Sequence, residues 1–68
     1  MNFIELTFGE SKTPIYINIE AVCAIYVDDD GDTLVKLNNN ESYWVTEEPE
    51  KIIEKISHTL ASLIAWGR

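Results

Sequence analysis

Acidic residues at alternating positions form the part of this sequence that comes closest to a chemical site. Asp28, Asp30 and Asp32 match the first, third and fifth positions of a calcium-binding loop, where carboxylate oxygens serve as ligands. The rest of the pattern fails, because Thr33 stands where such a loop has glycine and Asn39 where it has glutamate. We therefore expect a solvated hairpin loop here, with weak metal binding by the three aspartates as the alternative.

Two other side chains, His58 and Cys23, are candidates for reactive chemistry. A histidine acting as a general base needs a nucleophile beside it, and a reactive thiolate needs a cationic neighbour. His58 falls in a helical pattern without a nucleophile, and Cys23 falls among small apolar residues. The sequence therefore predicts an exposed or boundary histidine, a buried and inert cysteine, no cofactor and no enzymatic activity.

The size and charge of the chain limit its function further. It has 68 residues, and five Lys or Arg against 12 Asp or Glu give a formal charge of −7. One domain over residues 1–68 is expected, with a core too small for more than marginal stability. The acidic balance argues against nucleic acid and anionic lipid, and it is compatible with a basic protein partner. Without a secretion signal or a long apolar run, the expected location is the cytoplasm.

Five short runs of alternating apolar residues predict β-strands. They span about residues 2–8, 14–18, 22–28, 33–38 and 41–46. Between them lie residues that favour turns: a polar stretch after Phe8, an Asn18-capped turn, the Asp28–Asp32 loop and the Asn39–Asn40 pair. We expect the five strands to form a small antiparallel sheet.

One helix is predicted from Glu48 to Ile64, with Pro49 at its first position. Thr46, Glu47 or Glu48 is expected to cap its start and Gly67 to end it. Its apolar residues recur at helical spacing and are expected to face the sheet: Ile52, Ile53, Ile56, Leu60, Leu63 and Ile64. The predicted fold class is α+β, with a small antiparallel sheet of five short strands packed on one C-terminal helix.

Strand alternation places apolar side chains on both faces of the predicted sheet. The set expected to form the core is Ile4, Leu6, Ile15, Ile17, Ile25, Val27 and Val45. The set expected on the opposite face is Phe3, Tyr16, Tyr26, Leu34 and Trp44, with Trp66 in the tail. Scattered surface aromatics are common. A contiguous patch of them on so small a domain favours contact with a second copy or with another protein.

Several short segments carry a resemblance to a known family. They are Tyr16-Ile17-Asn18, Glu20-Ala21-Val22 with Ile25, Leu34 to Leu37, Tyr43-Trp44-Val45, Glu48-Pro49-Glu50 and Ile52 to Ile56. Together they cover about residues 3–60 and resemble the small flagellar and swarming motility proteins of the FlbD type. The resemblance implies a small, non-enzymatic, cytoplasmic protein of bacterial motility, with no catalytic residues to assign.

The function expected from these observations is a non-catalytic protein-interaction module that works as a homo-oligomer. Its contact surface would include the six exposed aromatic and leucine residues of the opposite face and the tail. The alternative is a regulatory protein that binds a cation or a small ligand through the Asp28–Asp32 loop.

Overall fold

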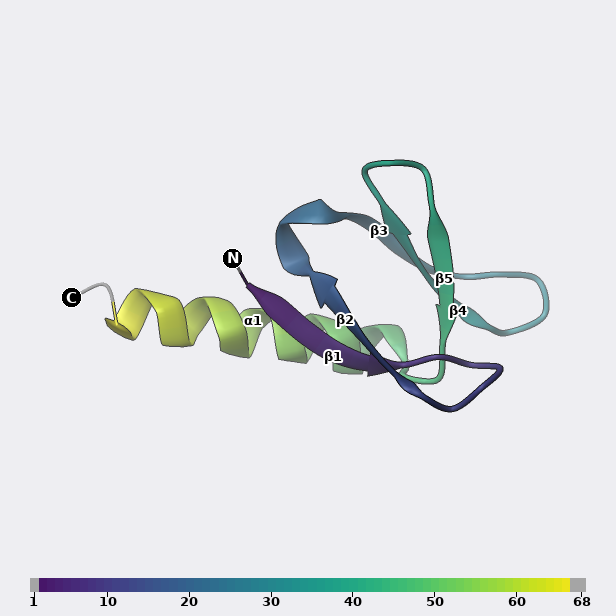
Figure 1. The fold of residues 1–68 in the computed structure, drawn as a ribbon, viewed down its shortest axis with the longest axis horizontal. Coiled ribbons are helices and arrows are strands. Elements are labelled where there is room, and N and C mark those ends of the chain that lie inside the picture. The colour runs from purple at the N-terminus through teal and green to yellow at the C-terminus, as the bar shows by residue number, and fades with distance from the viewer. Residues whose placement is uncertain (1, 67–68) are drawn as a thin grey trace.

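The chain forms five β-strands followed by one long helix, in the predicted order (Figure 1). This computed structural model describes residues 2–66, with side chains described through residue 61. The elements are β1 (Phe3–Thr7), β2 (Pro14–Asn18), β3 (Val22–Val27), β4 (Thr33–Leu37), β5 (Ser42–Val45) and α1 (Pro49–Trp66). A short 3-10 helix, η1 (Ile19–Ala21), joins β2 to β3. The α+β fold class is confirmed.

The turns between strands form where the sequence predicts them. The Asn18 side chain accepts a hydrogen bond of 3.0 Å from the Glu20 backbone N–H and so caps η1. Gly31 in the β3–β4 loop has a φ of 85°, and Asn40 in the β4–β5 turn has a φ of 72°. Both residue types tolerate this left-handed conformation better than most others, which explains why tight turns form at these two positions.

The five strands divide into two antiparallel sheets. One contains β1 and β2, and the other has the strand order β3-β4-β5. They meet just beyond the end of β1, where Phe8 forms an antiparallel bridge with Val45. The Gly9 N–H then donates a 2.9 Å hydrogen bond to the Trp44 carbonyl. The end of the first hairpin is therefore fastened to β5.

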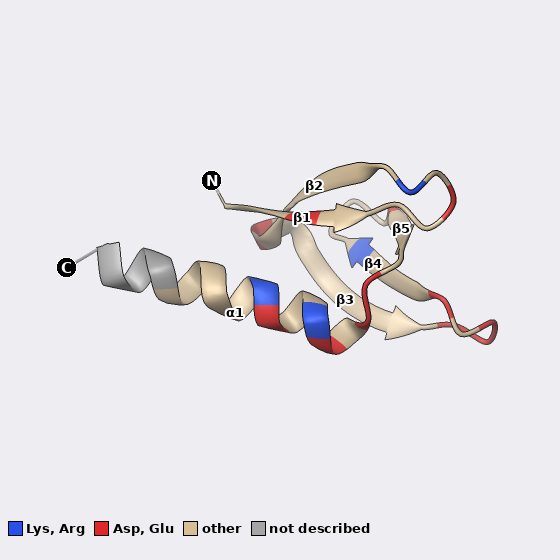
Figure 2. Cartoon of the chain, turned by 90° about the horizontal axis from the view of Figure 1, so that it is seen from below, with Lys and Arg blue, Asp and Glu red and all other residues tan. Residues whose placement is uncertain are grey.

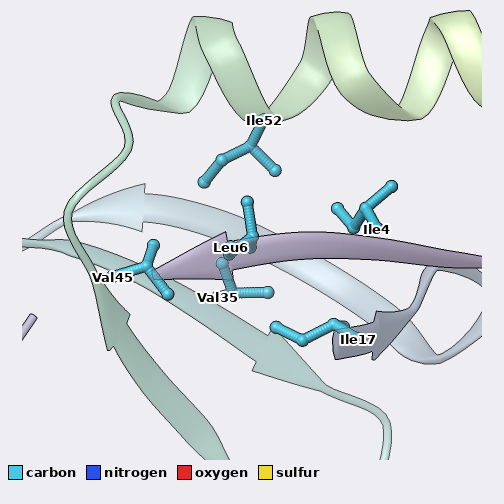
Figure 3. Packing of buried hydrophobic residues seen from close by; sticks show 6 residues of the cluster. All are labelled: Ile4, Leu6, Ile17, Val35, Val45 and Ile52. Carbon is cyan, nitrogen blue, oxygen red and sulfur yellow. The ribbon is translucent and has the colours of Figure 1, made fainter. Parts of the chain in front are cut away.

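A small apolar core lies between the two sheets and the helix (Figure 3). Its six buried residues come from four strands and α1: Ile4, Leu6, Ile17, Val35, Val45 and Ile52. Four of the seven residues expected in the core are thus buried, and Ile15 and Ile25 pack against them while half-buried. Because the core is so small, each of its side chains carries a large share of the fold's stability.

Two expectations about β3 are wrong. Val27, expected in the core, is 52% exposed, because it ends an edge strand and leads into a solvated loop. Cys23, expected to be buried, is exposed. It lies at an irregularity of the β3–β4 register between Val22 and Ala24, where an extra residue escapes the regular alternation of the strand.

The helix packs on the sheets through its N-terminal part and then extends beyond them (Figure 1). Ile52 is fully buried and Ile56 is half-buried against the core. Ile53 is 53% exposed and Leu60 45% exposed, so the expectation that both face the sheet is wrong. The strands are shorter than α1, and only one narrow side of its first turns meets them.

Several predicted features lie outside what the structure describes. They are the side chains of Leu63, Ile64 and Trp66, and the whole of Gly67. In the described part of the chain, no helix combines the length and the apolar character needed to cross a membrane.

Candidate interaction site

Three connections between elements border an open hollow of about 380 Å³. Lys12 comes from the β1–β2 turn, while Asp32 and Thr33 end the β3–β4 loop and begin β4. Trp44 of β5 and Glu48 of the segment before α1 complete most of its wall. We call this concavity the Trp44 hollow. The sequence does not reveal it, because its lining comes from segments far apart in the chain.

The Trp44 indole lies directly against Gly9, which is buried. A Cβ atom at position 9 would overlap the indole ring, with Nε1 only 2.6 Å away. Gly9 has no positive φ, so the position needs glycine for space and not for backbone conformation. Trp44 is nevertheless 40% exposed. The indole is thus held in place by backbone on one side while the rest of it remains accessible from the hollow.

Trp44 also ends a row of side chains that crosses the β3-β4-β5 sheet. Tyr26 pairs directly with Leu34, and Leu34 pairs directly with Trp44. Tyr26 is 42% exposed and Leu34 is half-buried. The structure therefore brings three of the six predicted interface residues together in one continuous row.

Phe3 and Tyr16, two other predicted interface residues, lie on the β1–β2 hairpin. Phe3 pairs with Asn18, and Tyr16 pairs with Glu5 one step further along, so the two aromatics are diagonal neighbours. Phe3 is 49% exposed and Tyr16 is 62% exposed. The predicted aromatic surface is thus divided between the two sheets, and the side chain of Trp66 lies outside the described part of the chain.

Acidic residues gather in the three connections that border the Trp44 hollow, and Figure 2 shows these stretches of the chain in red. Seven of the chain's 12 acidic residues lie in the three connections, which contain one lysine: Glu10, Asp28, Asp29, Asp30, Asp32, Glu47 and Glu48, with Lys12. The ion pair that the described side chains form is between Lys51 and Glu54, 3.9 Å apart on the helix surface. Most of the acidic residues therefore lie at this end, where the described side chains form no salt bridge.

Lys12 also lines the hollow and offsets part of that charge, because its ammonium keeps its positive charge while it bonds a neutral carbonyl. The residue has a φ of 61°, and its Nζ donates a 2.7 Å hydrogen bond to the Gly9 carbonyl. This bond closes the β1–β2 turn on itself. Among the described residues, neither the Asp32 nor the Glu48 carboxylate has a salt-bridge partner.

In the Asp28–Asp32 loop, called the aspartate loop below, hydrogen bonds from the loop's own backbone hold the Asp28 carboxylate in place. Asp28 Oδ1 accepts hydrogen bonds from the N–H groups of Asp30 and Asp32, at 3.0 and 2.9 Å. Oxygen atoms of the three carboxylates lie within 4.8 Å of one another, and in the described residues no other His, Cys, Asp and Glu side chains converge in this way. The structure thus brings the three predicted ligands together, but one Asp28 oxygen already serves the turn.

Phe8, at the junction between the sheets, makes an aromatic contact with Tyr43. The rings of Phe8 and Tyr43 meet edge to face with their centroids 6.1 Å apart. The Tyr43 hydroxyl donates a 3.0 Å hydrogen bond to the Glu41 carboxylate. This bond, together with the negative charge of Glu41, raises the pKa of Tyr43 above its ordinary value.

The two residues considered for reactive chemistry are both exposed and lie on different elements. His58 is exposed on α1, as expected for a surface histidine. Cys23 is exposed on β3. The structure therefore does not bring these two residues together.

Glu47 makes a contact that sequence reasoning missed. Its two carboxylate oxygens accept hydrogen bonds of 3.0 Å from the N–H and the hydroxyl of Thr7, 40 residues earlier in the chain. The helix start is formed by Glu48, whose carbonyl accepts the N–H groups of Lys51 and Ile52 at 3.0 and 3.1 Å. Glu47 therefore does not cap α1, as had been one expectation, but ties the segment before α1 to β1.

Replacing Glu47 by alanine is expected to lower the free energy of unfolding by about 1–3 kcal/mol, because both hydrogen bonds end on a charged and partly buried acceptor. Urea denaturation followed by circular dichroism would measure this. Glu54→Ala is the matched control, since its exposed ion pair contributes less than about 1 kcal/mol. If Thr7→Val and Glu47→Ala destabilise additively in the double variant, the two residues are not coupled and the interpretation is wrong.

These features define a small α+β protein with an aromatic hollow ringed by carboxylates. The chain belongs to the family of flagellar and swarming motility proteins (FlbD), whose match covers residues 4–63. The resemblance stated from the sequence is thereby confirmed, and the chain is a motility-associated small protein. No curated protein and no solved structure matches the chain.

Proposed function

We propose that this protein is a non-catalytic, cytoplasmic protein-interaction module of the bacterial motility apparatus that works as a homo-oligomer. The observation that carries the proposal is the exposure of Phe3 and Tyr16, at 49% and 62%, side by side on a domain with only six buried apolar residues. Large exposed aromatics on so small a fold are typical of a contact surface. The exposed and separated positions of Cys23 and His58 support a role without catalysis.

The outer side of the β1–β2 hairpin is the surface that best suits contact between copies. β2 carries no charged residue, and no strand of the described chain pairs with its outer edge. Such an edge is a template for pairing with another chain. Phe3 lies at the end of β1 away from the turn, about 13 Å from Thr7 at the usual rise of a strand. That distance exceeds the screening length of about 8 Å at physiological salt. Repulsion between the acidic ends of two copies is therefore screened here, and Glu5, the partner of Tyr16, is the one charged residue of the two strands.

Replacing Tyr16 by serine is expected to lower the solution mass at micromolar protein concentration, because it removes the most exposed aromatic of the hairpin. Light scattering coupled to size exclusion would measure the mass. Tyr26→Ser is the matched control: the same residue type, 42% exposed, on the other sheet. We expect the wild type and Tyr26→Ser to share an oligomeric mass and Tyr16→Ser to dissociate at least tenfold more readily.

Three outcomes would change this view in different ways. A wild-type monomer over the whole concentration range would remove the homo-oligomer. Dissociation by Tyr26→Ser and not by Tyr16→Ser would move the contact to the β3-β4-β5 sheet. An unchanged mass in both variants would exclude both aromatic surfaces.

The second candidate function is cation-dependent regulation through the aspartate loop, which the convergence of the Asp28, Asp30 and Asp32 carboxylates supports. On this hypothesis millimolar calcium raises the melting temperature of the wild type, because an ion bound only by the folded state stabilises it. The double variant Asp28→Asn/Asp30→Asn would lose the rise. Differential scanning fluorimetry in calcium, with sodium chloride of equal ionic strength as the control, is the measurement. If millimolar calcium does not raise the melting temperature of the wild type, this function is excluded and the double variant need not be measured.

A further inference from the structure

The outer face of the β3-β4-β5 sheet has no partner in the described chain, and it opens into the Trp44 hollow. The apolar row of Tyr26, Leu34 and Trp44 crosses this face and ends at the hollow's wall. The Trp44 indole cannot turn away toward Gly9, because the Gly9 backbone already touches it. The face therefore presents an aromatic ring, backed by Gly9 on one side, at the edge of a concavity.

The charge around this ring indicates what kind of group it would receive. Asp32 and Glu48 line the same hollow from two different connections, and five further carboxylates lie in the connections around it. Lys12 lines the hollow too and keeps its positive charge with its Nζ on the Gly9 carbonyl, so the two lining carboxylates outnumber the one ammonium. An aromatic face beside unpaired carboxylates is the combination that attracts an arginine or lysine side chain, through cation–π attraction and charge-assisted hydrogen bonds.

We propose that the Trp44 hollow binds an arginine or lysine side chain from a basic segment of another protein. The cation stacks on the Trp44 indole while the Asp32 and Glu48 carboxylates accept its N–H groups, and flanking apolar residues of that segment cover Leu34 and Tyr26. This inference rests on the proposed function, because it assumes that the chain acts by binding protein, and it assigns the partner's chemistry and the docking site.

The same observations disfavour other classes of partner. The phosphates of nucleic acids and of anionic lipids would meet seven carboxylates and one lysine, so their approach is repelled. A hollow of about 380 Å³ with an indole on its wall is also far larger than the cage of oxygen ligands that a calcium ion needs. A basic protein segment is the class that satisfies the charge and the aromatic ring together.

The test uses a short peptide of alternating arginine and glycine, acetylated and amidated, as the probe. The whole chain carries Trp66→Phe, which leaves Trp44 as its one tryptophan, so that Trp44 fluorescence reports binding at the hollow. The matched control peptide has glutamine in place of arginine. Isothermal titration calorimetry gives the affinity at low and physiological salt, where an electrostatic contact weakens as salt rises.

Three variants locate the binding. Asp32→Asn/Glu48→Gln should weaken binding of the arginine peptide by at least tenfold. Glu20→Gln/Glu54→Gln, which removes the same charge away from the hollow, should change the affinity by less than about twofold, because its contribution is screened. Trp44→Leu should weaken binding by about 3- to 30-fold, the range expected for loss of a cation–π contact. Circular dichroism must show each variant folded.

Three results with the peptides would overturn the proposal. Equal losses in the two charge variants would show general attraction to an acidic protein, and no binding of the arginine peptide by wild type would exclude the site. Equal binding of the glutamine peptide would exclude recognition of a cation. Light scattering of the same samples without peptide separates the two proposals. If the protein is an oligomer that does not bind the peptide, binding at the Trp44 hollow is wrong and the homo-oligomer stands. If the protein is a monomer that binds the peptide, the homo-oligomer is wrong and binding at the hollow stands.

Discussion

Replacing Ile52 by alanine is expected to lower the free energy of unfolding by about 2–5 kcal/mol, the range for removing a buried large aliphatic side chain. Ile52 is fully buried and is the one helix residue in the core cluster. Figure 3 shows it above Leu6, with Val45 to one side. Its loss leaves a cavity between α1 and β1 that the short strands cannot close. A domain of 68 residues has a total stability of roughly 3–10 kcal/mol, so this substitution removes much of it.

The neighbouring residue provides the control. Ile53 has the same side chain, occupies the next position of the same helix and is 53% exposed. Ile53→Ala should change stability by less than about 1 kcal/mol, because alanine has the better helix propensity and little apolar area is lost. Urea denaturation followed by far-UV circular dichroism would compare the two variants. Similar losses in both would mean that the helix docks through a broader surface than the structure shows.

Local signals were sufficient to predict the order of elements. The Asn18 turn, the glycine of the aspartate loop and Asn40 each act within a few residues, and each appears where the sequence places it. Period-two alternation also identified Ile4, Leu6, Ile17 and Val45 as buried. Such patterns work because the side-chain direction along one strand depends only on that strand's backbone.

Features that depend on contacts between distant segments were not predictable in the same way. Alternation assigns a side chain to one face of a strand. It does not predict that β1 and β2 form a sheet separate from the other three strands, nor which strand lies at an edge. The exposed Val27 and the divided aromatic surface both follow from that arrangement. Similarly, nothing near Glu47 indicates that its carboxylate will meet Thr7, because the pairing requires the β1–β5 junction to exist first.

The same limitation applies to the helix. Helical spacing groups Ile53 and Leu60 with Ile52 as one apolar face, but burial requires a partner surface as long as the helix. Here the strands have four to six residues and α1 has 18, so the pattern continues beyond what the fold covers. Periodicity thus predicted the helix correctly and overestimated how much of it is buried.

Gly9→Ala is expected to lower the free energy of unfolding by about 1–3 kcal/mol, the usual range for a methyl group forced into a packed site. The added Cβ would overlap the Trp44 indole, so either the ring leaves its position or β1 separates from β5. The second change also breaks the 2.9 Å hydrogen bond from the Gly9 N–H to the Trp44 carbonyl. Either response disturbs the junction that holds the two sheets together. Chemical denaturation followed by circular dichroism is the measurement.

A double-variant comparison tests whether this cost arises from the indole. In the Trp44→Ala background the ring is absent, so adding Gly9→Ala should then cost less than about 0.5 kcal/mol, and the two changes should be strongly non-additive. Gly31→Ala is the matched control, because its Cβ would meet nothing within 4 Å while its φ of 85° disfavours alanine. Its cost of about 1–2 kcal/mol is backbone strain and should be the same with or without Trp44. If the cost of Gly9→Ala is the same with and without Trp44, as expected for Gly31→Ala, then position 9 needs glycine for its backbone conformation. The contact between Gly9 and the Trp44 indole would then not explain the ring's orientation at the hollow.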